Sequence, residues 1–204
     1  METEIEAKFL DVDINNLRKR LKVLNAKRVH SEVLMKRKAF DYADNRLMKI
    51  GGWIRGRDEG DRITLSYKQL NDRTLHGTKE ISLDVDDFDN ACQLLLSIGL
   101  KQKAYQETKR EKWILDGNEV TIDTWPWIPS FVEIESNDEE SLKKIAKKLG
   151  FKWEEAMHGS VETVYQRHFD VTEEEVDKWK SIIFIDIPNW LEKKRKQEIQ
   201  EIKG

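Results

Sequence analysis

Apolar and polar residues alternate with two different periods along this chain. Residues 4–10 alternate strictly, which is the pattern of a half-buried strand. One face of this segment carries Glu4, Glu6 and Lys8, and the other face is apolar. We therefore expect a strand here with one fully charged face.

Three later segments have the apolar spacing of amphipathic helices. They follow Asp13, Asp87 and Asp138, and a carboxylate at this position accepts hydrogen bonds from the first free N–H groups of a helix. The second and third segments stop at Gly99 and Gly150, and glycine readily adopts the left-handed conformation that ends a helix. The pattern predicts helices over residues 14–24, 88–98 and 138–149.

The remaining regular segments have period two and are separated by turns rich in Gly and Asp. They predict strands at residues 34–42, 53–57, 62–68, 78–85, 106–115, 119–124 and 131–136. Short strands joined by turns, together with three helices, indicate an α+β fold with an antiparallel sheet. We expect one domain over residues 1–170 and a C-terminal helical extension over residues 171–204, interrupted at Pro188.

Composition and charge exclude several classes of function. Of the 204 residues 37% are charged, against a typical ~25%, yet the net charge is only −3. This balance argues against a nucleic-acid or acidic-membrane partner. Cys92 is the single cysteine, the N-terminus is acidic, and no run approaches ~18 apolar residues. We expect a cytoplasmic protein that contacts neither membrane nor nucleic acid.

Charged residues recur on single faces of one predicted strand after another. On one strand alone, such a face is the ordinary solvated side of a sheet. The repetition instead favours a sheet curled around a polar lumen, as in barrels whose strands alternate inward and outward residues. The residues that recur in this way are Glu4, Glu6, Lys8, Arg55, Arg57, Lys68, Glu80, Arg110, Asp123, Glu133 and Glu135.

Both signs of charge in one lumen indicate a specific kind of ligand. Confined carboxylates repel one another and protonate unless a cation compensates them, so the two Glu-Ile-Glu segments suit a hard cation, Mg²⁺ or Mn²⁺, and not zinc. Confined Arg and Lys side chains require an anion, and Arg suits bidentate contact with phosphate. The pattern predicts a metal polyphosphate.

The ordered charged motifs resemble a known family. The segment Glu4-Ile5-Glu6-Ala7-Lys8 is similar to the ExExK signature of the CYTH family, also called triphosphate tunnel metalloenzymes. The later segments FDYADNRLMKIGGWIRGR, ITLSYK, TKEISL, TKREKW and VTIDTWPWIPSFVEIES resemble further strands of that family, in the same order. The resemblance runs from about Glu4 to Tyr165.

The resemblance implies a closed eight-stranded antiparallel β-barrel, a tunnel with amphipathic helices packed outside, that binds a triphosphate and a divalent metal. It places carboxylates on the metal side at Glu4, Glu6, Asp123, Glu133 and Glu135. It places phosphate-binding cations at Arg55, Arg57, Lys68 and Arg110, and implies that Lys8 contacts the triphosphate or helps to activate the attacking group. Further candidates are Glu80, Lys36 and Lys38, with Arg37 on the opposite face from the two lysines.

Two segments depart from the family pattern. Many members have a Lys or Arg near the end of the barrel, where this chain reads HGSVETVY, so that His158 is the nearest substitute. The usual Gly-rich turn before the Glu-Ile-Glu strand is replaced by WPWIPS. Its Trp125, Trp127 and Pro129 either shape a tunnel mouth or stack on a base, or else pack in the core or the loop, and packing is favoured.

Three functions are compatible with these residues. The first is a metal-dependent phosphohydrolase acting on inorganic tripolyphosphate or on an organic triphosphate, thiamine triphosphate included. The second is a class IV adenylyl cyclase, in which the ribose 3′-hydroxyl attacks the α-phosphorus of ATP. The third is a non-catalytic module that binds polyphosphate. No motif separates hydrolase from cyclase, and the absence of an identifiable adenine site favours the hydrolase.

Overall fold

The predicted α+β architecture is confirmed in a computed structural model, which describes residues 2–3, 5–72 and 74–196. The strands are β1 (Glu2–Thr3), β2 (Ile5–Phe9), β3 (Lys27–Asp41), β4 (Gly52–Asp58), β5 (Ile63–Leu70), β6 (Thr78–Asp84), β7 (Lys101–Leu115), β8 (Asn118–Thr124), β9 (Phe131–Ser136) and β10 (Ser181–Ile182). The α-helices are α1 (Ile14–Val23), α2 (Phe88–Ser97), α3 (Glu139–Leu149), α4 (Glu162–His168), α5 (Glu173–Asp177) and α6 (Asn189–Glu192).

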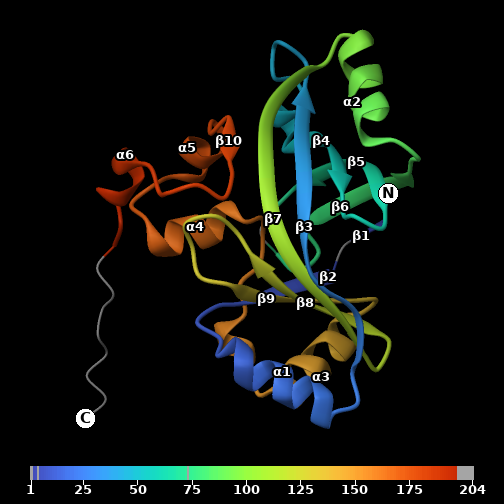
Figure 1. Cartoon of the computed structure of the whole chain (residues 1–204), viewed down its shortest axis with the longest axis vertical. Helices are drawn as coiled ribbons and strands as arrows, with labels where there is room; N and C mark the ends of the chain where they lie inside the picture. Colours follow the sequence, from blue (N-terminus) through green and yellow to red (C-terminus); the bar gives the residue numbers. More distant parts are fainter. Residues whose placement is uncertain (1, 4, 73, 197–204) are drawn as a thin grey trace.

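One strongly curled sheet contains all these strands. Its order is β1-β6-β5-β4-β3-β7-β8-β9-β2, every neighbouring pair in this path is antiparallel, and β10 pairs in parallel with β7. The long strands β3 and β7 form the centre of the sheet (Figure 1). Their ladder has three register shifts, and such bulges bend and twist a strand. The two ends of the path, β1 and β2, both lie within the first nine residues.

The three predicted amphipathic helices are present with their predicted caps. Asp13, Asp87 and Asp138 each accept a hydrogen bond from a backbone N–H of the first turn, at 3.0, 2.7 and 2.7 Å. Gly150 ends α3 with φ of +86°, in the left-handed region where a Cβ is unfavourable. The N-terminal hydrogen bonds of each helix are therefore formed within one turn, by residues close together in the sequence.

The main apolar core lies between the outer face of the sheet and the pair α1 and α3, which pack together below it (Figure 1). Ala7, Val120 and Val132 contribute from the strands, and Leu21 and Leu142 from the helices; all five are fully buried. Because strand side chains alternate between faces, this arrangement turns the charged positions toward the inside of the curl.

The C-terminal segment packs against the middle of the molecule. The sequence predicted two helical segments separated by Pro188; α5 and α6 are such segments, with Pro188 at the start of α6, and the strand β10 lies between them. Val176 and Leu191 of this segment join a cluster with Trp125, Tyr165 and Phe169. Residues 197–204 of the expected extension lie outside the described residues. Within the described part of the chain, no helix is both long and apolar enough to span a bilayer.

Candidate functional site

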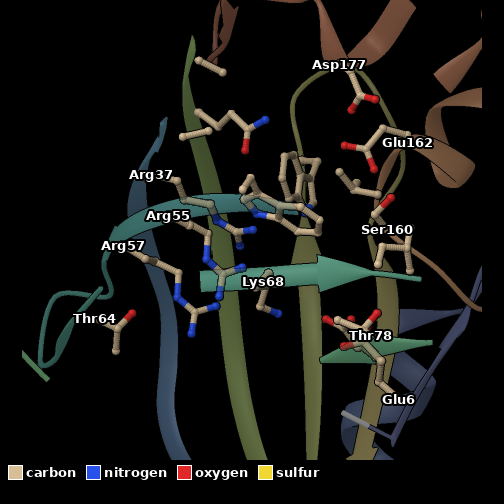
Figure 2. Close-up of a pocket in the computed structure, with 18 of the residues that line it drawn as sticks. Glu6, Arg37, Arg55, Arg57, Thr64, Lys68, Thr78, Ser160, Glu162 and Asp177 are labelled. Atoms are coloured by element: carbon tan, nitrogen blue, oxygen red, sulfur yellow. The ribbon is translucent and has the colours of Figure 1, made fainter. Parts of the chain in front are cut away.

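The inner face of the curled sheet lines a cavity of about 540 Å³. Charged side chains enter it from β2, β3, β4, β5, β7, β8 and β9, and residues from α4 and α5 line its remaining side. Figure 2 shows Arg37, Arg55 and Arg57 directed into the same space, with Glu6 on the opposite side and Lys68 between them. The cavity therefore has an acidic side and a basic side.

The acidic side is formed by the two Glu-Ile-Glu segments, which are neighbours in the sheet. Strands β2 and β9 pair antiparallel, so that Glu6 faces Glu135 and Lys8 faces Glu133 in the register. Residues more than 120 positions apart in the chain thus form one charged surface. Glu4 belongs to the same motif but lies outside the described residues.

Lys8 links the carboxylates of this surface. Its Nζ lies 2.7 Å from Glu6 Oε1 and 2.9 Å from Glu133 Oε1, and it donates to the carbonyl of Gly159 at 2.7 Å. Although burial favours the neutral amine, Glu133 and Glu6 hold the pKa of Lys8 above its ordinary value. Lys8 is therefore an ammonium in this arrangement, and a donor.

The two carboxylates that contact Lys8 differ in electrostatic state. Burial, and then the charge of Glu133, raise the pKa of Glu6 to about 7. Burial acts in the same direction on Glu133, but Lys8 and Arg110 hold the pKa of Glu133 well below its ordinary value. The pair therefore carries negative charge that a further cation can stabilise.

Arg110 connects the acidic side to the rest of the cavity. Its guanidinium donates to both oxygens of Asp123, at 2.6 and 2.7 Å, and to Glu133 Oε2 at 2.8 Å. Thr121 donates a further hydrogen bond to Asp123 at 2.9 Å. Both oxygens of Asp123, a residue expected on the metal side, are thus hydrogen-bonded to protein groups.

The basic side consists of Arg37, Arg55 and Arg57 on β3 and β4. Arg37 and Arg57 are register partners, and the Nε atoms of all three arginines are buried without a hydrogen-bond partner. Burial, followed by the charges of Arg55 and Arg57, holds the pKa of Arg37 well below its ordinary value. Burial and Arg55 lower the pKa of Arg57 to about 10. This cluster has more positive charge than its protein partners neutralise.

Glu80 and Lys68, two further predicted residues, pair with each other next to Arg55. Glu80 Oε1 is 3.4 Å from Arg55, and its Oε2 is 3.3 Å from Lys68 Nζ.

Arg37 also lies over the ring of Trp125, with 4.7 Å between its Cζ and the ring centroid. Trp125 is buried in the apolar cluster, as the packing alternative predicts, and its ring also lines the cavity.

Five sequence candidates are not among the residues that line the cavity: Lys36, Lys38, Glu80, Asp123 and His158. Strict alternation on β3 places Lys36 and Lys38 on the outer face, where they line a separate surface cleft, and Lys38 pairs with Asp89 of α2 at 2.9 Å. Arg37, on the opposite face, is the residue of this strand that enters the cavity. His158 contacts the backbone carbonyl of Glu6 at 3.3 Å and is not among the residues that line the cavity.

The sequence-based set omitted nine charged residues that line the cavity: Asp41, Glu59, Arg62, Lys103, Lys112, Glu119, Glu162, Glu173 and Asp177. Among them, Lys112 forms an ion pair with Glu119. Lys112 is two residues beyond Arg110 on the same strand face, so alternation indicates it. Glu59 and Arg62 lie in a turn, where a sequence pattern predicts solvent exposure.

The acidic side fits a divalent cation of the magnesium type. Among the described residues, no group of three or more Asp, Glu, His or Cys side chains is arranged to hold a metal ion. Mg²⁺ does not require such a group, because it keeps several waters and binds through one or two carboxylates together with substrate phosphates. Glu6 and Glu133 both line the cavity and provide carboxylate oxygens, and Glu6 lies across the cavity from Arg37, Arg55 and Arg57.

Comparison with protein families decides the assignment. The CYTH domain model matches residues 2–168. The chain belongs to the CYTH family. Enzymes of this family generally depend on divalent cations, and the family includes triphosphatases and cyclases. A search of curated proteins found no match.

Solved structures with the same fold support the CYTH assignment. A conserved hypothetical protein from Pyrococcus furiosus is 23% identical with a TM-score of 0.61, over 76% of this chain and 94% of that chain. A candidate adenylate cyclase from Vibrio parahaemolyticus is 14% identical with a TM-score of 0.69, over 81% and 98%. A candidate adenylyl cyclase from Hippeastrum, described as having a dominant triphosphatase activity, is 15% identical with a TM-score of 0.58, over 82% and 96%. At these identities the similarity shows the fold.

Proposed function

We propose that this chain is a divalent-metal-dependent triphosphatase that hydrolyses inorganic triphosphate or an organic triphosphate bound in the charged cavity. The observation that carries the proposal is the cluster of Arg37, Arg55 and Arg57, whose buried Nε donors lack partners. Buried donors and mutually repelling cations are unfavourable unless an anion completes them. Triphosphate supplies several charged oxygens along one chain, and arginine binds phosphate oxygens through paired donors.

In the proposed reaction, water attacks the terminal phosphorus in line with the bond to the bridging oxygen. The new P–O bond forms as the bridging bond breaks, a proton of the water passes to solvent or to the leaving oxygen, and orthophosphate and a diphosphate leave. Negative charge develops on the leaving oxygen and spreads over the terminal phosphoryl group, and the arginines and Lys68 are already oriented toward that charge.

Lys8 and the two glutamates have a positioning role in this proposal. Because Lys8 is protonated and contacts both Glu6 and Glu133, it holds the two carboxylates together, and its third N–H donates to the Gly159 carbonyl. Glu6 and Glu133 would hold the divalent cation. When bound, that cation supplies further neutralisation of charge on the phosphate oxygens.

Two structural features are part of the same proposal. We infer that the curled sheet closes into a barrel, because β1 pairs with β6 and β2 pairs with β9, with residue 4 between them. We also assign residues 1–170 to the catalytic domain and 171–204 to an extension. The end of the family match at residue 168 supports that boundary.

A class IV adenylyl cyclase is the second candidate. The observation in its favour is that the cavity continues past the arginines to an aromatic and aliphatic wall, with Trp125, Val161, Val176 and Trp179. A base and ribose fit such a wall. In that reaction the ribose 3′-oxygen bonds to the α-phosphorus and pyrophosphate leaves, giving cyclic AMP.

Product analysis separates these functions. The purified chain is incubated with tripolyphosphate, ATP or thiamine triphosphate, each with Mg²⁺ or Mn²⁺, and Arg57→Ala and Lys38→Ala are run in parallel. We expect orthophosphate release that Arg57→Ala abolishes and that Lys38→Ala, on the outer face, retains. Cyclic AMP with pyrophosphate would replace the hydrolase by the cyclase. Binding of all three compounds without turnover would leave a binding module.

A further inference from the structure

The turn between β4 and β5 folds one acidic residue back into the cavity. Residues 58–62 read Asp-Glu-Gly-Asp-Arg, a composition typical of an exposed turn. The Glu59 N–H donates to the carbonyl of Arg62 at 2.8 Å, and Gly60 has φ of +89°, which glycine adopts without strain. Gly60, Asp61 and Arg62 are exposed, whereas Glu59 is only 8% exposed.

Glu59 continues the row of inward residues on β4. Trp53, Arg55, Arg57 and Glu59 are two positions apart in sequence, and all four line the cavity. Along one edge of the cavity the row therefore runs from an aromatic ring through two cations to an anion. The anion stands at the end formed by the turn.

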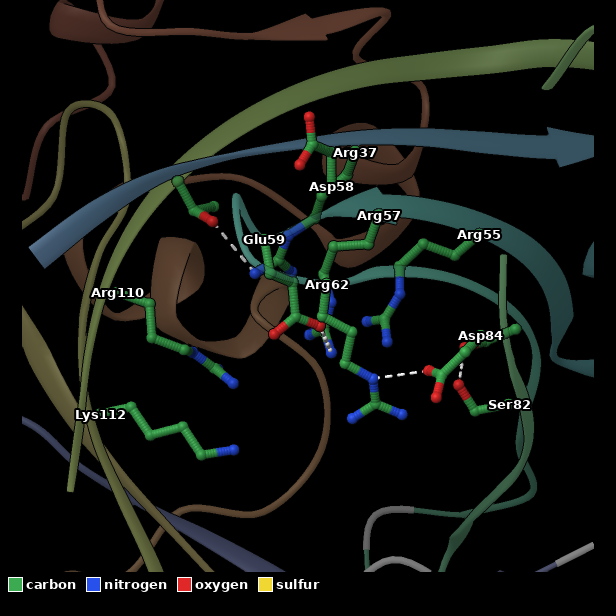
Figure 3. A network of polar contacts seen from close by, with 12 residues as sticks. Arg37, Arg55, Arg57, Asp58, Glu59, Arg62, Ser82, Asp84, Arg110 and Lys112 are labelled. Carbon is green, nitrogen blue, oxygen red and sulfur yellow. Dashed lines mark hydrogen bonds and ion pairs between the residues drawn. The ribbon is translucent and has the colours of Figure 1, made fainter. Parts of the chain in front are cut away.

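The environment of Glu59 is almost entirely cationic. Its Oε1 lies 2.5 Å from a terminal nitrogen of Arg57. Figure 3 shows its carboxylate surrounded by Arg57, Arg62 and Arg110. Burial alone would raise the pKa of Glu59, but Arg57 and then Arg110 hold it below its ordinary value, so the carboxylate is charged.

A charged carboxylate in that place resembles a phosphate group in charge and in its oxygen acceptors. It takes one position on the arginine cluster that a phosphoryl group would otherwise use. We propose that Glu59 terminates the phosphate-binding row and selects triphosphate over longer inorganic polyphosphates. A fourth phosphoryl group extending beyond Arg57 would meet the Glu59 carboxylate, and rejection by a fixed like charge is a direct source of specificity. This inference rests on the proposed function, because it assumes that the anion in the cavity is a phosphate chain.

The turn supplies a matched control. Asp61 is two residues from Glu59 and carries the same charge, but it is exposed and does not line the cavity. Glu59→Gln and Asp61→Asn each remove one negative charge from the same turn with little change of shape. Only Glu59→Gln removes it from the row.

Isothermal titration calorimetry with inorganic triphosphate and tetraphosphate, on the full chain without divalent cation, tests this role. We expect the wild type to prefer triphosphate. In Glu59→Gln, the ratio of tetraphosphate to triphosphate affinity should rise roughly 10-fold, since a like charge is removed from the path of the fourth group. Asp61→Asn should leave the ratio unchanged, and Glu59→Asp, which keeps the charge, should remain closer to the wild type than Glu59→Gln.

Each other outcome has a defined meaning, and a thermal melt of each variant shows that it is folded. An unchanged ratio in folded Glu59→Gln would overturn the role of Glu59 and leave the triphosphate site intact. An equal rise in Asp61→Asn would also overturn it, because overall charge and not position would then set the ratio. If the wild type binds neither compound, the proposed function fails together with the inference.

Discussion

The two sides of the cavity differ in how their buried charged side chains are paired. On the acidic side, Lys8 and Arg110 lie within 2.9 Å of Glu6, Asp123 or Glu133, so that each of these three carboxylates is paired with a cation. On the basic side, arginines adjoin arginines, and three Nε atoms have no partner. The carboxylates of the first side are paired with cations of the protein itself, whereas the second side keeps buried donors that no protein group satisfies. We infer that the acidic side contributes to folding as well as to holding a cation, whereas the basic side contributes mainly to binding an anion.

The comparison predicts its largest effect at Lys8. Lys8→Met leaves two buried carboxylates without their shared cation, and loss of one partner of a buried ion pair costs about 3–5 kcal/mol of unfolding free energy. Urea denaturation followed by tryptophan fluorescence measures this. Lys112→Met removes the more exposed Lys112–Glu119 pair as a control and should cost less than about 1 kcal/mol. If both variants lost the same free energy of unfolding, the Lys8 ion pairs would contribute no more to stability than the more exposed Lys112–Glu119 pair.

The next effect is on binding by the basic side. Arg37→Ala removes a buried cation with an unpartnered donor and should weaken triphosphate binding roughly 100-fold, the scale of charge-assisted hydrogen bonds in a desolvated site. Lys38→Ala changes the neighbouring residue on the outer face of the same strand and should leave the affinity within about 2-fold. Titration calorimetry without divalent cation measures both. Similar losses from the two substitutions would indicate a diffuse charge effect.

A smaller effect is expected when the acidic side is changed conservatively. Glu133→Gln should raise the Mg²⁺ or Mn²⁺ concentration needed for half-maximal activity about 10-fold, because one carboxylate ligand is lost. Triphosphate binding without metal should change much less. A metal titration of orthophosphate release, alongside calorimetry, checks this. A metal dependence equal to that of the wild type would remove Glu133 from the metal side.

The smallest expected effect is on the stability of the basic side. Arg37→Met removes the Arg37 contacts with Trp125 and Thr108. It also removes the cost of burying the guanidinium charge and the repulsion of that charge by Arg55 and Arg57. The free energy of unfolding without ligand should therefore change by no more than about 1 kcal/mol. Urea denaturation under the conditions used for Lys8→Met gives the comparison. A loss as large as that from Lys8→Met would mean that the basic side also holds the fold together.

Much of this architecture is predictable from local pattern. The helix caps at Asp13, Asp87 and Asp138 depend on contacts within one turn, and the strand β9 has the predicted bounds, residues 131–136. Alternation also groups Arg55 with Arg57, and Glu133 with Glu135, on single faces. These features depend on residues near one another in sequence.

Features that depend on pairing between distant segments were not predictable. Strand β3 carries cations on both faces, so its pattern alone cannot tell whether Lys36 and Lys38 or Arg37 face inward. Pairing of Arg37 with Arg57 decides it. Likewise, β10 forms by pairing with Tyr105 and Gln106 of β7. This strand has only two residues, which is too short to show an alternating pattern in the sequence. Glu59 was missed because a turn residue was expected to be in solvent, although the row of Arg55 and Arg57 leads to it.

The central claim is that the basic side is an incomplete site for a phosphate chain. The most direct test is titration calorimetry of the unmodified full chain with inorganic triphosphate and, separately, with orthophosphate, in the absence of divalent cation. We expect triphosphate to bind at least roughly 100-fold more tightly than orthophosphate, because one chain engages several arginines at once. Equal affinity for the two anions, or no binding of triphosphate, would contradict it.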